Sequence, residues 1–382
     1  KRMLSLFLLA STIQAKTPTW ETTIEQAVPS IVSIRIASNR FFDTETASNS
    51  VATGFIVDAE RGIILTNRHV VEPGPVTSQA ILLNNEEIDI WPVYRDPVHD
   101  FGFYRYNPED INFLDVQSLE LCADCPEVGL PVRLIGNDAG EKISILEATI
   151  ARLDRNTPNY GWGKYNDFNS FYIQAAAGSS GGSSGSPVLN QHGKVIALNA
   201  GGSRRAASSF FLPLDRVERA LKQIQSGEEV SRGTLLATFR FEPYDQARRL
   251  GLSKEEESAF RAEFPKRDGV LILRKITHLG PLFQDFREGD VLLGINGKRV
   301  SAFVSLEEIL DSNVGKELVI EMERAGKKIS VKVPVTDLHS VTPNQFVEAC
   351  GASINALSYQ MGRHFPIPLN GVYVAFPGYC FQ

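Results

Sequence analysis

The stretch Ala52-Thr-Gly-Phe-Ile-Val-Asp-Ala-Glu-Arg-Gly-Ile-Ile-Leu-Thr-Asn-Arg-His69-Val-Val71 contains two short apolar runs and, directly after the second, a histidine. Short apolar runs that are bounded by glycine and charged residues predict β-strands. A histidine at a strand end is held rigidly and stays accessible, as a catalytic base must be. Because histidines also have many structural roles, His69 indicates catalysis only if it has partners.

Strand-like runs continue on both sides of this stretch, in two successive sets. Two sets of about six short strands predict two small antiparallel barrels, because closure of a sheet removes its exposed edges. Helices are expected at 20–27 and at 215–226, and Gly227 ends the second of them. The first set covers 30–36, 52–57, 62–65, 79–83, 88–93 and 101–106, and the second covers 129–135, 143–153, 171–175, 187–189, 195–200 and 209–212.

Length and composition limit the class of protein. A chain of 382 residues is longer than one core usually organises, so two or three domains are expected. With 43% hydrophobic and 22% charged residues, it is neither disordered nor fibrous. Its net charge of -6 gives no reason to expect a nucleic-acid partner. After the N-terminal segment, no run is long and apolar enough to predict a membrane span.

The pattern changes after residue 231. Residues 232–335 combine five apolar strands with helices at 253–262 and 305–310, which predicts a small mixed α/β module. Residues 336–382 open a further unit. At the other end, residues 1–19 have a basic start, a short apolar run and a small residue at Ala15. A secretory signal and an apolar tail both explain this segment, and the alternatives stay open.

The four cysteines are expected to be ordinary thiols. Cys122 and Cys125 have metal-knuckle spacing, but no second pair follows to complete a zinc site. The pair precedes Pro126 in a loop-like stretch, whereas a redox pair normally opens a helix. Together with Cys350 and Cys380, they are too few in so long a chain for a disulfide scaffold.

Two further residues complete a candidate triad with His69. A serine hydroxyl becomes a nucleophile when an imidazole takes its proton and a carboxylate orients that imidazole. Asp100 begins a strand of the first barrel, and Ser184 lies in a glycine-rich segment of the second. Glycine at 182 leaves room for the backbone N–H groups of Gly182 and Ser184 to form an oxyanion hole. Residues 178–186 alone could be a flexible linker, but they run straight into the apolar strand at 187–189.

These segments resemble the HtrA (Do-like, Deg) serine proteases over residues 20–335. The segments 52–71, 100–103 and 133–137 are similar to the histidine, aspartate and Ile-Gly-Asn segments of that family. The family serine follows ten residues after a strand glutamine, and ten residues after Gln174 is Ser184. Ser183 stands where the family has asparagine, and 175–176 is Ala-Ala instead of Thr-Asp.

The α/β module resembles a PDZ domain. Residues 289–297, Gly-Asp-Val-Leu-Leu-Gly-Ile-Asn-Gly, are close to a PDZ signature. The segment Thr234, Leu235, Leu236 and Ala237 is similar to the loop that receives a peptide's C-terminal carboxylate through backbone N–H groups. Leu236 replaces a family glycine, which would narrow or close the groove. A purely structural PDZ is the alternative.

The resemblance implies a mainly β fold: a chymotrypsin-like double β-barrel at 20–228, a PDZ domain at 232–335 and the start of a further PDZ-like module at 336–382. It implies a serine endopeptidase that cleaves unfolded or exposed polypeptide segments, without metal or cofactor. Residues Ser209, Phe210 and Phe211 would line the substrate cleft. C-terminal peptides would bind the PDZ domain. Neither nucleic acid nor membrane is an expected partner.

Segments 95–102, 136–142 and 181–187 look like those of large eukaryotic members with several PDZ-like modules, which include fungal nuclear pro-apoptotic proteases and plant Do-like enzymes. This branch implies a nuclear location, whereas a secretory signal would imply an organelle lumen. Trimers are common in the family, although no residue here requires a homo-oligomer. An inactive protease-fold scaffold and a holdase-type chaperone are the alternative functions.

Overall fold

The computed structural model describes residues 18–73, 75–137, 143–161, 163–176, 183–203, 208–278, 280–365 and 367–381. The N-terminal segment up to residue 17 and Gly182 lie outside the described residues, and the signal and oxyanion predictions depend on them. Within the described part of the chain, no helix combines the length and the apolar character needed to cross a bilayer.

The first sheet is antiparallel and is built from strands that are consecutive in the sequence. They are β1 (Ile31–Ser38), β2 (Ser48–Asp58), β3 (Ile63–Thr66), β4 (Val76–Ile81), β5 (Glu87–Asp89), β6 (Trp91–Arg95) and β7 (Gly102–Arg105). Their order in the sheet is β5-β4-β1-β2-β3-β7-β6. The prediction of one strand at 88–93 was wrong. Two strands lie here instead. β5 pairs with β4 at one edge of the sheet, and after Ile90 the chain crosses to the opposite edge, where β6 pairs with β7.

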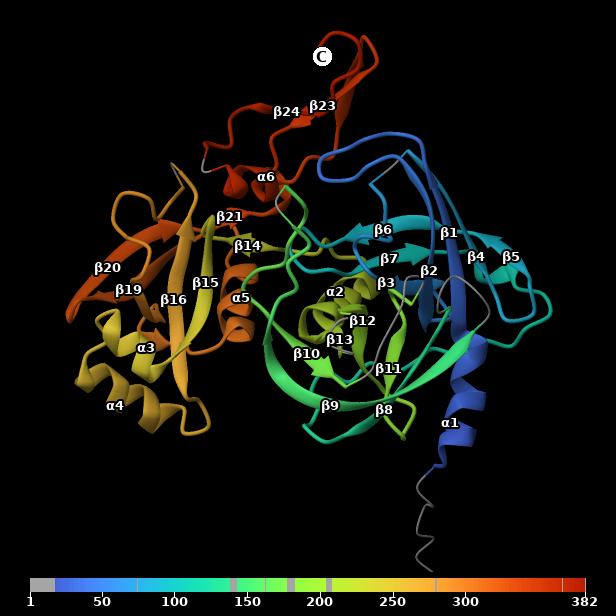
Figure 1. The fold of residues 1–382 in the computed structure, drawn as a ribbon, viewed down its shortest axis with the longest axis horizontal. Coiled ribbons are helices and arrows are strands. Elements are labelled where there is room, and N and C mark those ends of the chain that lie inside the picture. Colours follow the sequence, from blue (N-terminus) through green and yellow to red (C-terminus); the bar gives the residue numbers. More distant parts are fainter. Residues whose placement is uncertain are drawn as a thin grey trace, which may run out of the picture.

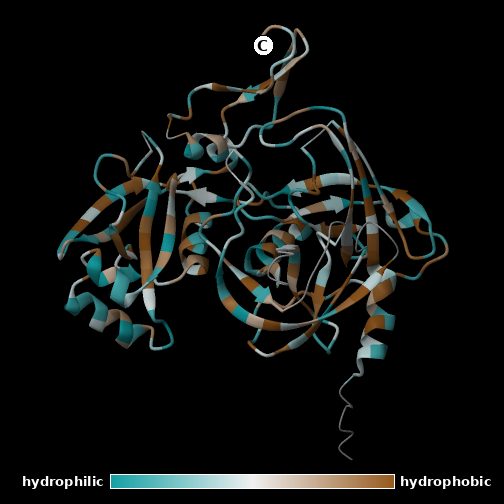
Figure 2. Ribbon diagram, viewed as in Figure 1, coloured by the Kyte–Doolittle hydropathy of each residue, from teal (hydrophilic) through white to brown (hydrophobic). Residues whose placement is uncertain are grey.

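The second sheet closes into a barrel in the order β10-β13-β12-β11-β8-β9. Its strands are β8 (Pro131–Gly136), β9 (Ser144–Asn156), β10 (Phe171–Ala175), β11 (Pro187–Leu189), β12 (Val195–Ser203) and β13 (Ser208–Leu212). The predicted mainly β, double-barrel fold is confirmed. Figure 2 shows hydrophobic and hydrophilic residues alternating along β9, whereas the short strands β3 and β11 are buried throughout.

Both predicted helices of this unit are confirmed. Helix α1 (Trp20–Ala27) begins after Thr19, whose hydroxyl accepts a hydrogen bond from the backbone N–H of Thr22, a typical N-cap. Helix α2 (Asp215–Ser226) ends at Gly227, which has a left-handed φ of 74°. One core cluster joins the two sheets and α2, and it includes Phe55, Leu65, Tyr172, Leu198 and Val217. Short 3₁₀ turns lie at Val28–Ser30 (η1) and Pro108–Asp110 (η2).

The α/β module lies beside the barrels (Figure 1). Its main sheet has the order β15-β16-β17-β19-β20, with β18 paired to β17, and a small sheet joins β14 to β21. Leu236, with a φ of +51°, lies in the short break between β14 and β15. The elements are β14 (Gly233–Thr234), β15 (Ala237–Pro243), α3 (Tyr244–Arg249), α4 (Lys254–Glu263), β16 (Gly269–Ile276), β17 (Val291–Ile295), β18 (Lys298–Arg299), α5 (Phe303–Asp311), β19 (Glu317–Arg324), β20 (Lys327–Pro334) and β21 (Thr336–Asp337).

The chain ends in a small unit, which we call the C-terminal module (residues 339–381), at the top of Figure 1. Its three strands form a sheet of order β22-β23-β24. The elements are η4 (His339–Val341), β22 (Phe346–Ala349), β23 (Ala352–Ala356), α6 (Tyr359–His364) and β24 (Val372–Phe376). This module contacts the loop between β1 and β2, where the ring of Phe376 stacks on Phe41 at 4.7 Å.

Candidate active site

His69 and Asp100 are in direct contact. His69 follows β3 in a turn, and Asp100 precedes β7, which pairs with β3. The Nδ1 atom of His69 lies 3.0 and 2.9 Å from the two carboxylate oxygens of Asp100, and the backbone N–H of His69 donates to the same carboxylate at 3.1 Å. The Asp100 carboxylate is buried, whereas 42% of the His69 side chain is exposed. The imidazole is therefore held at Nδ1 by Asp100, and the rest of the ring is partly open to solvent.

The charge of Asp100 sets the basicity of His69. Burial disfavours the protonated ring, but the negative charge of Asp100 and its hydrogen bond outweigh burial and raise the pKa of His69 above 6.5. A carboxylate on Nδ1 directs the Nε2 atom toward the open side. This arrangement suits a group that takes a proton from a substrate or a nucleophile.

The loop that carries Asp100 is held by two other aspartates. The Asp96 carboxylate accepts hydrogen bonds from the backbone N–H groups of Val98 and His99 at 2.8 and 2.7 Å. The backbone N–H of Asp100 donates to Asp167, at 3.0 Å. Burial and the neighbouring charge of Asp100 raise the pKa of Asp167 to about 8. Asp167 therefore stabilises the position of Asp100 without adding a full second charge at neutral pH.

Ser184 lies in a turn that contacts the first sheet. Its carbonyl oxygen accepts a hydrogen bond from the backbone N–H of Thr53 in β2 at 2.9 Å. Gly185 has a φ of +83°, and a Cβ atom there would lie 2.0 Å from the carbonyl oxygen of Thr53. Only glycine fits this turn, because both the backbone conformation and the space exclude a side chain. The turn is thereby fixed against the sheet that carries His69.

The three predicted residues line one cavity of about 370 Å³, together with Glu45 and Tyr165. Glu45 comes from the loop between β1 and β2, and Tyr165 from the loop between β9 and β10. Burial disfavours the charge of Glu45, but Arg95 and Arg68 outweigh burial and lower its pKa. Arg68 also lies over the Tyr165 ring, 3.4 Å from its centroid. One side of the cavity therefore carries the carboxylate of Glu45, whose negative charge is balanced by Arg68 and Arg95.

All residues of the predicted cleft strand, β13, are buried, but neighbouring side chains face different sides. Phe210 lines a second cavity of about 590 Å³, and Tyr160 lines both this cavity and the one with Ser184. Phe211 is fully buried in the core of the second barrel. Ser209 is also buried. Alternation along the strand explains why neighbouring residues face opposite sides.

The sequence analysis did not identify Glu45, Asp167 or the buried Arg232. Arg232 forms ion pairs with Asp96 at 3.1 Å and with Asp311 at 2.8 Å. Isolated charged residues in loops carry no motif. For Arg232, the available signal was its position at the predicted boundary between the barrels and the α/β module. His99 is also buried, and its Nδ1 lies 3.1 Å from the Arg232 guanidinium.

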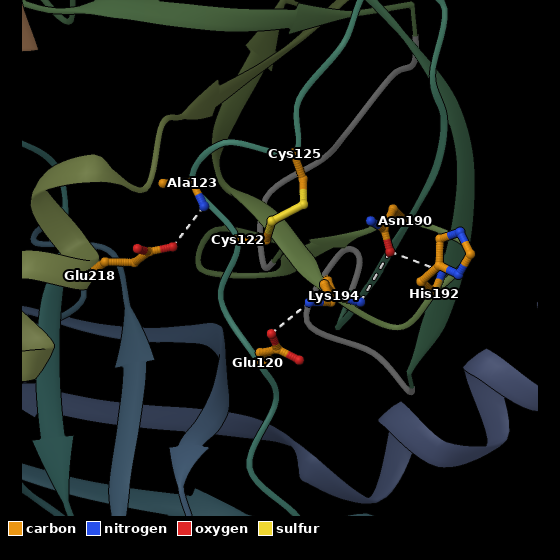
Figure 3. Close-up of a disulfide and its surroundings, with 8 residues drawn as sticks. All are labelled: Glu120, Cys122, Ala123, Cys125, Asn190, His192, Lys194 and Glu218. Carbon is orange, nitrogen blue, oxygen red and sulfur yellow. Dashed lines mark hydrogen bonds and ion pairs between the residues drawn. A yellow bond between two sulfur atoms is a disulfide. The ribbon is translucent and has the colours of Figure 1, made fainter.

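The expectation of ordinary thiols was wrong. Cys122 and Cys125 form a disulfide, with Cα atoms 5.4 Å apart, and Cys350 and Cys380 form another at 5.8 Å. Figure 3 shows the first disulfide beside Glu218 of α2, which accepts a hydrogen bond from the backbone N–H of Ala123. The two cysteines belong to no complete metal or redox motif, but the turn between them brings their Cα atoms within the range that a disulfide requires.

Comparisons with known proteins place these features in one family. The trypsin-like peptidase domain family matches residues 52–198, and the PDZ-like domain family matches residues 340–382. "Pro-apoptotic serine protease NMA111" of Vanderwaltozyma polyspora is 51% identical over 93% of this chain. "Protease Do-like 7" of Arabidopsis thaliana is 49% identical over 94%. The chain spans only 36% and 34% of the length of these two relatives.

Solved structures agree on the fold. "HtrA-type protease AlgW with tripeptide" matches 84% of this chain and 97% of that chain, with a TM-score of 0.62 and 21% identity. The serine endoprotease from Yersinia pestis matches 84% of this chain and 98% of that chain, with a TM-score of 0.56 and 19% identity. Over more than nine-tenths of its length the chain is therefore similar to the fungal and plant serine proteases named above, and it has the trypsin-like fold of the HtrA-type proteases.

Proposed function

We propose that this chain is the catalytic portion of a serine endopeptidase that cleaves unfolded or exposed polypeptide segments. The observation that carries the proposal is the His69–Asp100 contact in the cavity that Ser184 also lines. His69 acts as general base and then as general acid, Asp100 orients it, and Ser184 attacks the scissile carbonyl. The backbone N–H groups of Gly182 and Ser184 would stabilise the oxyanion.

Each module of the chain has its own proposed role. We propose residues 20–228 as the peptidase, 232–335 as a PDZ domain for peptide binding or regulation, and 336–382 as the start of a further PDZ-like module. Substrate chains would extend along β13, beside Phe210. Peptide C-termini are the proposed ligands of the loop from Thr234 to Ala237, in competition with any residues of this chain that occupy the groove.

A fluorophosphonate probe tests the catalytic assignment, because it reacts only with an activated serine. We expect the native chain to be labelled and Ser184→Ala to lose all labelling. The matched control is Ser180→Ala in the same glycine-serine run, which should keep it. A folded native chain that is not labelled at all would overturn the enzyme and favour the scaffold. Proteolysis of an unfolded protein should fall about 10⁶-fold in Ser184→Ala.

Location and assembly are separate proposals. The family resemblance supports the nucleus, whereas two disulfides favour an oxidising compartment, where such bonds persist. Imaging of the tagged full-length protein, together with alkylation of free thiols in cell extracts, separates these alternatives. Sedimentation of the purified protein tests the proposed homo-oligomer.

A further inference from the structure

The cavity beside Phe210, which we call the Phe210 cavity, adjoins the cavity with Ser184. Its volume is about 590 Å³, and Tyr160 lines both cavities. Strand β12 also passes from one to the other, because Ala200 lines the cavity with Ser184 and Gly201 lines the Phe210 cavity. A polypeptide that extends from Ser184 along this strand therefore enters the Phe210 cavity.

Two arginines supply the charge of the Phe210 cavity. The described residues that line it include Arg152 and Arg155 and no aspartate or glutamate, and the other described lining residues are uncharged. An excess of positive charge in a cleft attracts anionic groups and repels cations. The cavity is therefore suited to an acidic side chain of a bound polypeptide.

Arg155 is held in place without a carboxylate partner. Its guanidinium lies over the Phe210 ring, 4.1 Å from the centroid, and its Nη1 donates to the side-chain oxygen of Gln174 at 2.8 Å. Among the described residues, no acid forms an ion pair with it. Because a guanidinium carries several N–H donors, others remain for the carboxylate of a ligand.

The fold places these groups in one row across the second barrel. Gln174 of β10 pairs with Arg152 of β9 on one side and with Phe210 of β13 on the other, and Phe210 pairs in turn with Gly201 of β12. Residues that are directly paired in antiparallel strands have their side chains on the same face. The row ends at Gly201, where the φ of +145° favours glycine and an added Cβ would meet no described atom within 4 Å. This end of the cavity is therefore open.

The edge of β12 indicates the direction of a bound chain. β11 pairs with β12 only as far as Leu198, and among the described residues 201–203 pair with β13 alone. The turn with the candidate nucleophile lies at the start of this stretch, because the N–H of Gly185 donates to the carbonyl of Asn199 at 3.0 Å. β11 is antiparallel to β12. A substrate that continues this edge in the same sense places the residues before its scissile bond beside 201–203.

We propose that the Phe210 cavity is a subsite for acidic residues, in which Arg155 binds an aspartate or glutamate on the N-terminal side of the scissile bond. The inference rests on the proposed function and names the class of segment that the peptidase prefers. Arg152 contributes less, because its Nε already pairs with Asp154 at 2.8 Å and both side chains are more than half exposed.

Cleavage of matched peptides tests the subsite. The sites cut in a denatured, unphosphorylated protein are mapped by mass spectrometry. One frequent site is then made as internally quenched peptides that carry Glu, Gln or Lys at each position before the scissile bond in turn. At one position we expect kcat/KM of the Glu peptide to exceed that of the Lys peptide at least about tenfold, because the carboxylate gains charge-assisted hydrogen bonds and the ammonium is repelled. This ratio should fall as salt is added.

Variants of the arginines locate the preference. Arg155→Gln should bring the Glu-to-Lys ratio close to one, and Arg155→Glu should reverse it. The matched control is Arg35→Gln, which removes an exposed arginine of β1 that pairs with Glu87 and should keep the native ratio. If the Arg155 variants do not fold, Arg152→Glu decides, because it places a carboxylate in the lining from an exposed position and should lower the ratio at least about threefold.

The subsite and the proposed function fail in different ways. A labelled, active chain that cuts the Glu and Lys peptides equally at every position overturns the subsite alone. A ratio that is unchanged in a folded Arg155→Gln, or in Arg152→Glu where that variant decides, does the same. A folded chain that no fluorophosphonate labels and that cuts no peptide overturns the proposed function and the subsite with it.

Discussion

The two modules that flank the barrels are attached by contacts of opposite kinds. The α/β module is joined through Arg232, only 1% exposed, which pairs with Asp96 of the first barrel and Asp311 of α5. The C-terminal module is joined through hydrogen bonds, such as that from the Ser358 hydroxyl to Asp43 at 2.6 Å, and through aromatic contacts such as that of Phe376 with Phe41. A half-exposed ion pair, Arg40–Glu348, adds to this second attachment.

The difference shows which attachment can open. Separation of the α/β module would break the buried ion pairs of Arg232 with Asp96 and Asp311 at the same time. Release of the C-terminal module would return hydrogen-bonding groups to water and expose rings such as Phe376, and the ion pair that it would break, Arg40–Glu348, is already half-exposed. Both attachments reach loops beside the candidate cavity, through Asp96 near Asp100 and through Asp43 near Glu45. We therefore expect the α/β module to stay attached to the barrels, and the C-terminal module to be the one that can detach.

The largest expected effect comes from breaking the buried attachment. Arg232→Met leaves Asp96 and Asp311 without their shared cation, and we expect the free energy of unfolding to fall by about 3–5 kcal/mol. Urea unfolding measures it. Arg152→Met removes an exposed ion pair with Asp154 and should cost at most about 1 kcal/mol. Equal losses in both variants would show that the Arg232 ion pairs contribute no more than an exposed pair.

The pH profile of proteolysis sharpens the comparison next. Only neutral His69 can act as base, and Asp100 raises its pKa, so kcat/KM should fall as pH drops through a value above 6.5. If Arg232 maintains the Asp100 loop, this acid limb moves to lower pH in Arg232→Met, because His69 loses part of its carboxylate contact. Ser358→Ala should leave the limb in place. A limb that shifts equally in both variants contradicts the prediction.

A smaller effect is expected at the C-terminal attachment. Ser358→Ala removes the hydrogen bond to buried Asp43 and also the N-cap of α6, and we expect a loss of about 1–3 kcal/mol. Burial already raises the pKa of Asp43, and loss of the serine hydroxyl raises it further. Thermal unfolding measures the loss, with Ser226→Ala, at an exposed helix end, as the control. A loss as large as that of Arg232→Met would mean that this attachment is not separable.

The smallest effect is expected for Arg40→Ala. The Arg40 and Glu348 side chains are 39% and 47% exposed, and such pairs contribute about 0–1 kcal/mol. A double-mutant cycle with Glu348→Gln gives the coupling energy, which should decrease as salt is added. A coupling above 2 kcal/mol that does not depend on salt would show that this pair behaves as a buried one.

Local patterns predicted the elements well, and contacts between distant residues could not be predicted. The helix at 215–226 agrees with the structure because its apolar spacing and Gly227 are signals within a few residues. The short helix α3 was missed, since six residues after a proline carry no clear period. The partners of Arg232 lie 136 residues before it at Asp96 and 79 after it at Asp311, and nothing in the chain marks such a pairing.

The same limit applies to the candidate site. His69, Asp100 and Ser184 were found because each belongs to a motif with fixed local spacing. Asn169 and Phe171 belong to none, and their contacts are with β15 and α5, which lie about 70 to 140 residues further along the chain. Cys350 and Cys380 are 30 residues apart in the sequence, so their pairing likewise depends on the fold that brings them together.

The position of Arg232 also bears on how such chains evolve. This arginine lies in the connection between peptidase and α/β module, yet its carboxylate partners belong to both. If recombination replaced the α/β module at this connection, Asp96 would need a new cation as its partner. If the arginine were kept, the new module would have to supply an acid in place of Asp311. Peptidase and neighbour are thus expected to be inherited as a pair, while modules further along the chain are free to be gained or lost.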